Sequence, residues 1–256
     1  MRKRTKIAIG VVAFLLIAAY VGLWGYSAQW FQKEIDRLYA DNTDNVEFMG
    51  AKPRLANFPF VPKVIYSGGL KIGNAEILFP QVQLKGYPLP GTALKIDFPL
   101  GVSLGGVVDP ALWTLDSLKA AVTIPYHLPE DFTYEGLSAW RDKDGSLTVR
   151  SYELNKGTLH SSGKGHLFLD EQLQPDLAFE SEIYGYQDFI AEQQRNGRIE
   201  PFPAAGATMI LNSLSAQDEK TGQSYVPIDV TVKNGILSAG PIQALELPPI
   251  VWGRRS

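Results

Sequence analysis

Two stretches near the middle of the chain decide its fold: "SLTVRSYEL" (residues 146–154) and "LAFESEIYGY" (residues 177–186). Apolar and polar residues alternate in both, and this period of two is typical of a β-strand with one buried and one exposed face. Gly, Pro, Asn or Asp residues separate these stretches from similar ones on either side. The pattern therefore predicts strands that are joined by turns.

The same alternation recurs across residues 46–186. Further examples are "LKIGNAEILF" (70–79), "TALKIDF" (92–98) and "LKAAVTI" (118–124). With 24 Gly and 17 Pro in 256 residues, turns at such intervals favour an antiparallel meander over alternating βαβ units.

The C-terminal third adds helices and a hairpin. Apolar residues fall at helical spacing in residues 186–197 and 207–214, and "VPIDVTVKNGILSAGPI" is typical of two strands that turn at Asn234-Gly235. The predicted fold class is therefore β-rich α+β. It consists of an N-terminal transmembrane helix followed by an elongated antiparallel β-meander with two or three short helices.

The N-terminus indicates a membrane anchor. Residues 7–28 contain no charged residue and follow four basic ones, Arg2, Lys3, Arg4 and Lys6. A helix of this length extends roughly 33 Å, enough to cross a hydrocarbon core of about 30 Å. Because basic residues precede the segment and none follows it closely, the N-terminus is predicted to stay in the cytoplasm.

This predicts a single-pass protein of the bacterial inner membrane in three parts. Residues 1–28 form a cytoplasmic basic tail and a transmembrane signal anchor, 29–45 a juxtamembrane helix and linker, and 46–256 a periplasmic β-rich domain. The alternative is a cleaved signal peptide, whose apolar region is usually about 7 to 15 residues long. A cut after Ala28 would place Tyr26 where a small residue is preferred.

A stripe of apolar residues follows the predicted span. In "QWFQKEIDRLY" (residues 29–39), apolar residues recur at helical spacing with charged residues between them: Trp30, Phe31, Ile35, Leu38 and Tyr39. Such a stripe is predicted to pack against its own domain. The alternative is a helix that lies in the membrane interface, where Trp and Tyr are favoured.

Charge limits the classes of partner. The chain has 24 Lys and Arg against 27 Asp and Glu, and four of the basic residues precede the predicted span. The exported part thus carries a net charge of −7, which argues against nucleic acid and against anionic lipid head groups as main partners. The expected partners are the inner membrane, through residues 7–28, and lipid or envelope proteins. The chain has no Cys, so it has neither a disulfide nor the lipidated Cys of a lipoprotein anchor.

Three segments carry a resemblance to a known family. They are "NFPF" (57–60), "LDEQLQPDLAFESEIYGYQDFI" (169–190) and "VPIDVTVKNGILSAGPIQALELPPI" (226–250). With the export anchor, they resemble an uncharacterised family, a domain of unknown function, of membrane-anchored periplasmic proteins found mainly in alphaproteobacteria and loosely similar to AsmA-like proteins. The resemblance implies an envelope location and a β-rich architecture, and it transfers no catalytic residue.

One enzyme motif matches by spacing alone. In "LHSSGKGHLF" (159–168), Ser161 and Lys164 satisfy the Ser-x-x-Lys spacing of penicillin-binding enzymes, and residues 220–222 match their Lys-Thr-Gly element. That motif needs a helix, whereas Gly163 and Gly165 flank this Lys in a strand-like stretch. We interpret the stretch as a strand whose polar face carries His160, Ser162, Lys164 and His166, with the two glycines on the other face permitting a close approach by another backbone.

Other chemical groupings are incomplete. His160 and His166 share a predicted strand face without a third ligand, and His127 lies in a separate segment. The carboxylate pairs at 130–131 and 170–171 fall in turn-like segments, where such residues are solvated. No catalytic residue, metal site or cofactor is predicted.

Aromatic residues form the one candidate ligand site. Phe58 and Phe60 would share a strand face, and Phe79 and Phe98 can join them as an apolar lining, with Phe132 as a further contributor. Core packing is the alternative for these residues.

The sequence thus predicts a non-catalytic binding or interaction protein of the cell envelope. A structural or assembly role is the first expectation, and binding or transfer of lipid or another hydrophobic ligand is the alternative. An exported hydrolase is the contrasting hypothesis.

Overall fold

A single antiparallel sheet dominates the computed structural model of the chain. Among the residues that the structure describes, it contains fifteen strands and is accompanied by four helices. The structure describes residues 2–40, 46–57, 60–72, 75–105, 114–219, 221–247 and 249–253. The predicted β-rich α+β class is confirmed within these residues.

Most strands pair with their neighbours in sequence, which confirms the predicted meander. The main path through the sheet is β1-β3-β4-β5-β8-β9-β10-β11-β13-β14-β15. The first eight strands are β1 (Val46–Gly50), β2 (Arg54–Ala56), β3 (Lys63–Ile72), β4 (Ala75–Lys85), β5 (Ala93–Phe98), β6 (Val102–Gly105), β7 (Thr114–Leu115) and β8 (Ser117–Thr123). The others are β9 (Leu147–Lys156), β10 (Leu159–Leu169), β11 (Pro175–Tyr184), β12 (Ala216–Gln217), β13 (Ser224–Lys233), β14 (Ile236–Ala239) and β15 (Ile242–Glu246).

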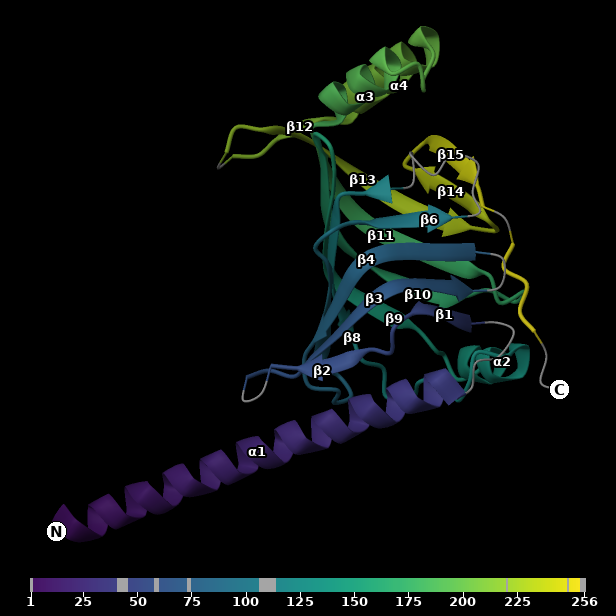
Figure 1. The fold of residues 1–256 in the computed structure, drawn as a ribbon. Helices are drawn as coiled ribbons and strands as arrows, with labels where there is room; N and C mark the ends of the chain where they lie inside the picture. Colours follow the sequence, from purple (N-terminus) through teal and green to yellow (C-terminus); the bar gives the residue numbers. More distant parts are fainter. Residues whose placement is uncertain are drawn as a thin grey trace.

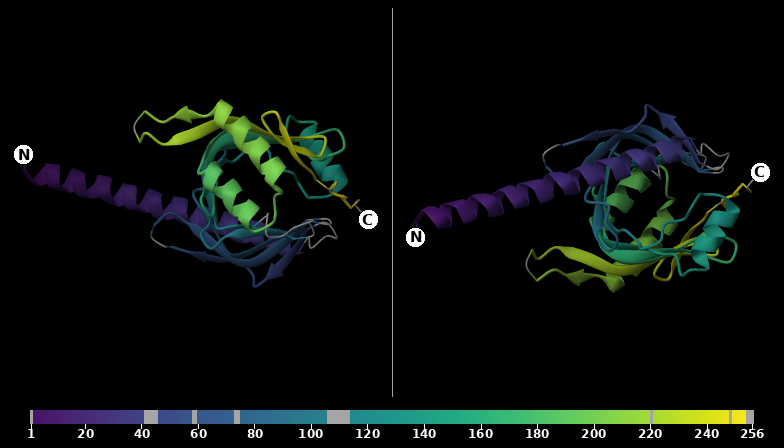
Figure 2. Two further views of the ribbon diagram at one scale, coloured as in Figure 1. Left: turned by 90° about the horizontal axis from the view of Figure 1, so that it is seen from above. Right: turned by 90° about the horizontal axis from the view of Figure 1, so that it is seen from below.

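The sheet curls, so it has a concave and a convex face (Figures 1 and 2). The helix pair α3 (Tyr186–Arg195) and α4 (Pro201–Leu214) lies over one end, and α1 (Arg2–Ala40) crosses the other end. Strand pairing places apolar residues opposite each other on the concave face, as in the row Ile96, Ala120 and Tyr152. Helices α1, α3 and α4 pack on the sheet from this concave side.

Helix α1 packs on the sheet through the apolar stripe predicted after the membrane span. Phe31 and Ile35 are buried against Val64 of β3, with the half-buried Leu84 and Leu94 beside them. This confirms that the stripe packs against its own domain. The helix ends at Ala40, just before the polar run of residues 41–45.

The predicted span forms part of α1. The side chains of residues 1–14, 17 and 38–40 lie outside the described residues. In the described part of the chain, no helix combines the length and the apolar character needed to cross a membrane.

The helix pair at the other end forms a second core. Tyr186 and Ile190 of α3 and Ala204 of α4 are buried against Val226 and Ile228 of β13. The Tyr186 hydroxyl donates a hydrogen bond of 2.8 Å to Asn212 Oδ1 in α4. Both helices were expected from their apolar spacing, although α4 begins earlier than predicted.

Helix α2 (Tyr134–Arg141) interrupts the region predicted to consist of strands. Thr133 caps it by accepting a hydrogen bond of 3.2 Å from the Gly136 amide, and Leu137 and Trp140 are buried. The strand prediction for residues 46–186 is therefore wrong at this segment.

The two glycines of β10 allow neighbouring atoms to approach closely, as predicted. A methyl group at Gly163 would collide with the Glu180 carbonyl oxygen, and one at Gly165 with the Ala178 carbonyl oxygen and the Phe179 ring. The pairing of β10 with β9 shifts by one residue between these glycines, which marks a β-bulge.

We expect Gly165→Ala to destabilise the fold by about 1 to 3 kcal/mol, because the added methyl group forces the backbone of β11 to move. Gly206→Ala, in α4, is the matched control: nothing lies within 4 Å of its added methyl group, and Ala favours a helix. Urea unfolding followed by circular dichroism measures both free energies. Equal loss of stability in the two variants would contradict the proposed close packing at Gly165.

Candidate functional site

The concave face of the central strands is apolar and only partly covered. Leu118 and Ala120 of β8, Leu154 of β9 and Phe179 of β11 are all half-buried. The core clusters that α1 and the pair α3 and α4 form with the sheet include residues at the strand ends, such as Leu94 and Leu159. Among the described residues, no helix packs over the middle of β8–β11. The candidate functional site is this part of the concave face, which strands β8–β11 form.

Three hydroxyl groups meet near the centre of the concave face. The Tyr152 hydroxyl donates a 2.6 Å hydrogen bond to Ser181 Oγ and lies 3.1 Å from Ser161 Oγ. Ser161 and Ser181 are only 6% and 5% exposed, so these contacts satisfy polar atoms that water hardly reaches. This hydroxyl cluster links three neighbouring strands, β9, β10 and β11.

No basic side chain of β10 lies beside the hydroxyl cluster. The strand register places His160, Ser162 and Lys164 on the convex face, opposite Ser161. Lys164 instead forms an exposed ion pair of 3.0 Å with Glu180. The Ser-x-x-Lys spacing therefore brings no lysine to the serine.

Two of the four predicted lining residues are in contact. The rings of Phe79 and Phe98 pack edge to face at 5.3 Å, and Phe79 is 3% exposed within a core cluster that includes Tyr66. Phe60 lies in the turn before β3 and is 68% exposed, so it does not join them. Phe58 lies outside the described residues. The further contributor, Phe132, is half-buried just before α2.

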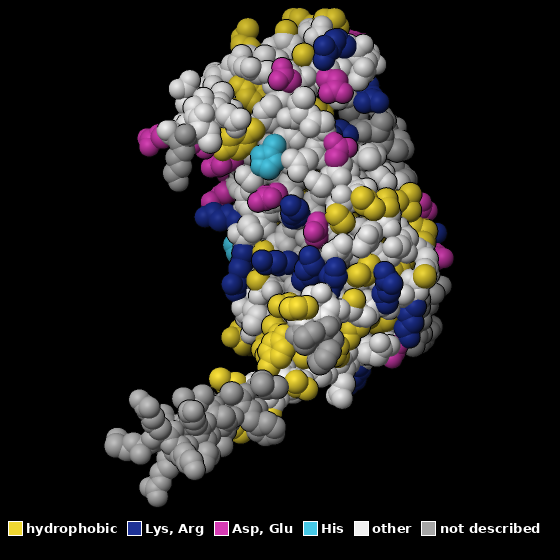
Figure 3. All heavy atoms as spheres, turned by 60° about the vertical axis from the view of Figure 1, so that its left-hand side comes forward, with side chains coloured by type: hydrophobic (Ala, Val, Ile, Leu, Met, Phe, Trp, Pro, Cys, Tyr) yellow, Lys and Arg dark blue, Asp and Glu magenta, His cyan; other side chains and the backbone are white. Residues whose placement is uncertain are grey.

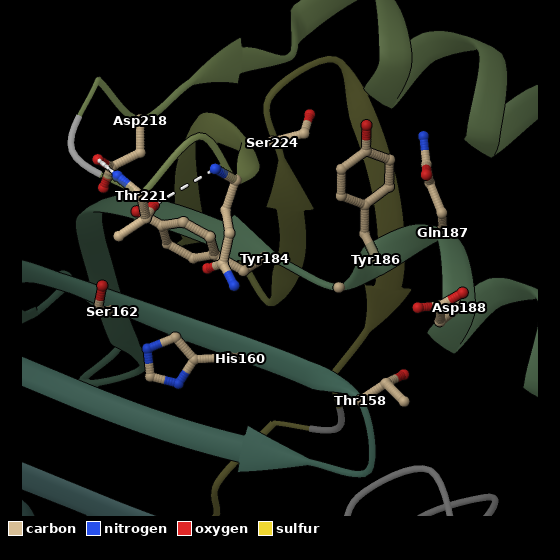
Figure 4. A pocket seen from close by; sticks show the side chains of 12 residues that line it. Thr158, His160, Ser162, Tyr184, Tyr186, Gln187, Asp188, Asp218, Thr221 and Ser224 are labelled. Carbon is tan, nitrogen blue, oxygen red and sulfur yellow. Dashed lines mark hydrogen bonds between the residues drawn. The ribbon is translucent and has the colours of Figure 1, made fainter.

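Two of the predicted polar residues of β10, His160 and Ser162, line a pocket on the convex side (Figure 4). This pocket of about 610 Å³ lies between β10, β11, the start of α3 and the turn after β12. His160 Nδ1 is 2.8 Å from Asn155 Oδ1, and Asp218 accepts a hydrogen bond from the Thr221 amide. Burial, followed by a hydrogen bond to Glu182, raises the pKa of the Tyr184 hydroxyl.

The histidines do not converge. His166 pairs through Nδ1 with Thr148 Oγ1 at 3.3 Å, six residues along β10 from His160, and the His127 carbonyl accepts a hydrogen bond from Trp140. Among the described residues, no group of three or more His, Cys, Asp or Glu side chains could hold a metal ion.

One aspartate of each carboxylate pair stabilises a local turn. Asp131 Oδ1 accepts hydrogen bonds from the amide and hydroxyl of Thr133, just before α2. Asp170 Oδ1 accepts from the amides of Gln172 and Gln174 in the turn between β10 and β11. These contacts explain the two aspartates by backbone capping.

A row of lysines on the convex face escaped the sequence analysis. Lys63, Lys85 and Lys95 lie directly opposite one another on β3, β4 and β5. Figure 3 shows Lys and Arg side chains crossing this face above a hydrophobic patch, near the point where α1 emerges. We call the three residues the lysine row. They are separated by 22 and 10 positions in sequence, so only strand pairing brings them together.

We expect Tyr152→Phe to lower the free energy of unfolding by about 1 to 3 kcal/mol, because it leaves buried serine hydroxyls without a shared partner. Tyr126→Phe, whose parent residue is 78% exposed, is the control and should change stability by less than about 0.5 kcal/mol. Urea unfolding of both variants measures the difference. A loss no larger than that of the control would show that the hydroxyl cluster contributes nothing to stability.

Comparison with known proteins identifies a family but no activity. Neither a curated protein nor a solved structure matches the chain. A family described as "Uncharacterized protein conserved in bacteria (DUF2125)" matches residues 81–248, about two thirds of the chain. The matched region contains the hydroxyl cluster and the helices α2, α3 and α4. The chain therefore belongs to the DUF2125 family of uncharacterized proteins conserved in bacteria.

Proposed function

We propose that this protein is a non-catalytic binding protein of the bacterial cell envelope. Residues 7–28 span the inner membrane, the N-terminus lies in the cytoplasm and the β-rich domain lies in the periplasm. The concave face holds a hydrophobic ligand, such as the acyl chain of a phospholipid. The observation that carries this proposal is the apolar, half-buried surface of β8–β11, over whose middle no helix of the described residues packs.

The support for the anchor comes from the sequence. The 22 uncharged residues follow four basic ones, as expected for a signal anchor with its N-terminus inside. The anchor continues without a break into the part of α1 that packs on the sheet through Phe31 and Ile35. The domain would thus be held close to the membrane. As part of this proposal, we infer that the protein is related to membrane-anchored, AsmA-like proteins found mainly in alphaproteobacteria.

The support for a ligand is energetic. A sheet normally covers its apolar face with a second layer, and here the helices cover only the two ends. Each Å² of apolar surface left in water costs about 25 cal/mol, so an acyl chain on the concave face would gain free energy by covering it.

A role in envelope assembly is the second candidate. Phe202 and Met209 on α4 are 91% and 74% exposed, and Ile210 and Leu214 of the same helix are each 40% exposed. Large apolar side chains gathered on one helix are typical of surfaces that contact another protein. This candidate uses the outer side of the helix pair and leaves the concave face free.

Photo-crosslinking tests the ligand role. The full chain is placed in lipid nanodiscs that contain a phospholipid with a photoreactive acyl chain, and crosslinked peptides are mapped by mass spectrometry. We expect crosslinks on β8–β11 that fall severalfold in Ala120→Trp, because the indole fills the concave face. Ala121→Trp points to the convex face and is the matched control. Crosslinks confined to residues 7–28 would contradict the ligand role.

A reporter fusion tests the topology. Alkaline phosphatase fused after Ser256 should be active, because the enzyme needs disulfides that form only outside the cytoplasm. The control is the same fusion with residues 7–28 deleted, which should be inactive. Activity in the deletion, or inactivity of the intact fusion at equal expression, would refute the proposed orientation.

A further inference from the structure

Three loops meet at the end of the sheet where α1 crosses. They comprise residues 60–62, 86–92 and 124–128, and we call them the end loops. The Gly86 amide donates a hydrogen bond of 3.2 Å to the Pro62 carbonyl, and the Gly91 amide donates one of 2.9 Å to the Ile124 carbonyl. These bonds hold the loops side by side.

The end loops expose apolar side chains. Phe60 and Tyr126 are 68% and 78% exposed, and Val61 and Leu128 are 42% and 41% exposed. Single exposed apolar residues are ordinary, but four on adjoining loops form a patch. Figure 3 shows hydrophobic side chains gathered at this end of the molecule, beside the N-terminal helix.

The end loops lie at the level of the predicted membrane span. The Tyr87 side chain in the second loop forms a hydrogen bond with Tyr20 of α1. Tyr20 lies inside residues 7–28, and the helix rises about 12 Å from Tyr20 to Ala28. Insertion of the span would therefore bring the end loops into contact with the bilayer, on the side where residue 28 leaves it.

The lysine row borders the end loops. Lys63 follows the first loop directly, Lys85 immediately precedes the second, and Lys95 lies three residues after it. Within the described residues, none of the three forms an ion pair with a carboxylate. Like charges directly opposite on paired strands are destabilising, so the row brings no benefit to the fold itself.

We propose that the end loops and the lysine row form a docking surface for the anionic lipid surface of the membrane that holds α1. This proposal rests on the proposed anchor. The apolar side chains enter the head-group region, where Tyr and other amphipathic residues are favoured. The lysines lie over the phosphates of anionic lipids, to which juxtamembrane basic residues are attracted.

The charge pattern favours a lipid surface over a soluble partner. The net charge of −7 outside the span predicts weak attraction to anions overall, but it hides a local segregation. Acidic residues such as Glu180, Glu182 and Asp229 lie on β11 and β13, strands that are far from β3–β5 in the sheet order. The lysine row thus lies away from these carboxylates, at the end of the sheet next to α1.

Site-specific fluorescence tests this docking, since the chain has no Cys and any introduced thiol is unique. The full chain with Val61→Cys carries an environment-sensitive dye and is reconstituted into vesicles of phosphatidylcholine alone or with about 30% phosphatidylglycerol. Lipid-borne quenchers report contact of the dye with the bilayer. We expect quenching in both vesicles, at least twofold stronger with phosphatidylglycerol, and weakened by high salt.

Charge variants separate the lysine row from general electrostatics. Lys63→Gln, Lys85→Gln and Lys95→Gln combined should abolish the enhancement by phosphatidylglycerol. The matched control removes three lysines that lie away from the end loops, Lys143→Gln, Lys164→Gln and Lys233→Gln, and should retain the enhancement. Thermal unfolding by circular dichroism checks that both triple variants are folded.

A second label distinguishes failure of docking from failure of the anchor. Ala19→Cys, in the predicted span, reports insertion of α1 in the same vesicles. If this label is quenched by a mid-bilayer quencher while the label at position 61 stays exposed to water, docking is refuted and the anchor stands. If neither label is quenched, both proposals are refuted. An equal effect of the two triple variants also overturns the role of the lysine row.

Discussion

The whole structure depends on one continuous ladder of antiparallel backbone hydrogen bonds. Because side chains alternate along a strand, the register of this ladder decides which face each residue occupies, and a slip by one position would reverse the two faces. The register shifts at Tyr66/Gly68, Ala121/Val122 and Gly163/Gly165. Such bulges bend a strand and increase its twist, which agrees with the curl seen in Figure 1.

Much of this ladder was predictable from local pattern. The hairpin at Asn234-Gly235 has positive φ at both residues, 52° and 75°, as the sequence indicated. The packing of Phe31 and Ile35 on the sheet was also predictable, because apolar residues with a period of 3.6 identify the buried face of a helix. Helix α2 was missed because it is only eight residues long and is supported by distant contacts. Its Tyr134 amide bonds to the Gly253 carbonyl, a contact that no local pattern reveals.

The candidate site was harder to predict than the fold. Alternation places Phe79 and Phe98 correctly on neighbouring strands, where they meet. It fails at Phe60, which belongs to a loop next to prolines, so the period of two does not apply there. Periodicity also gives no information on what covers a face. The open middle of β8–β11 and the lysine row both depend on pairing between strands that are distant in sequence.

The open form of the sheet has a mechanical consequence. Within the described residues, the outermost strands β1 and β15 do not pair with each other, and the chain has no Cys to tie them. A closed cylinder of strands has a diameter set by the number and stagger of its strands. Here the two rims can move apart or together through small changes of twist at each strand pair, with every backbone bond kept. The width of the concave face can therefore change while the sheet keeps its hydrogen-bonded ladder.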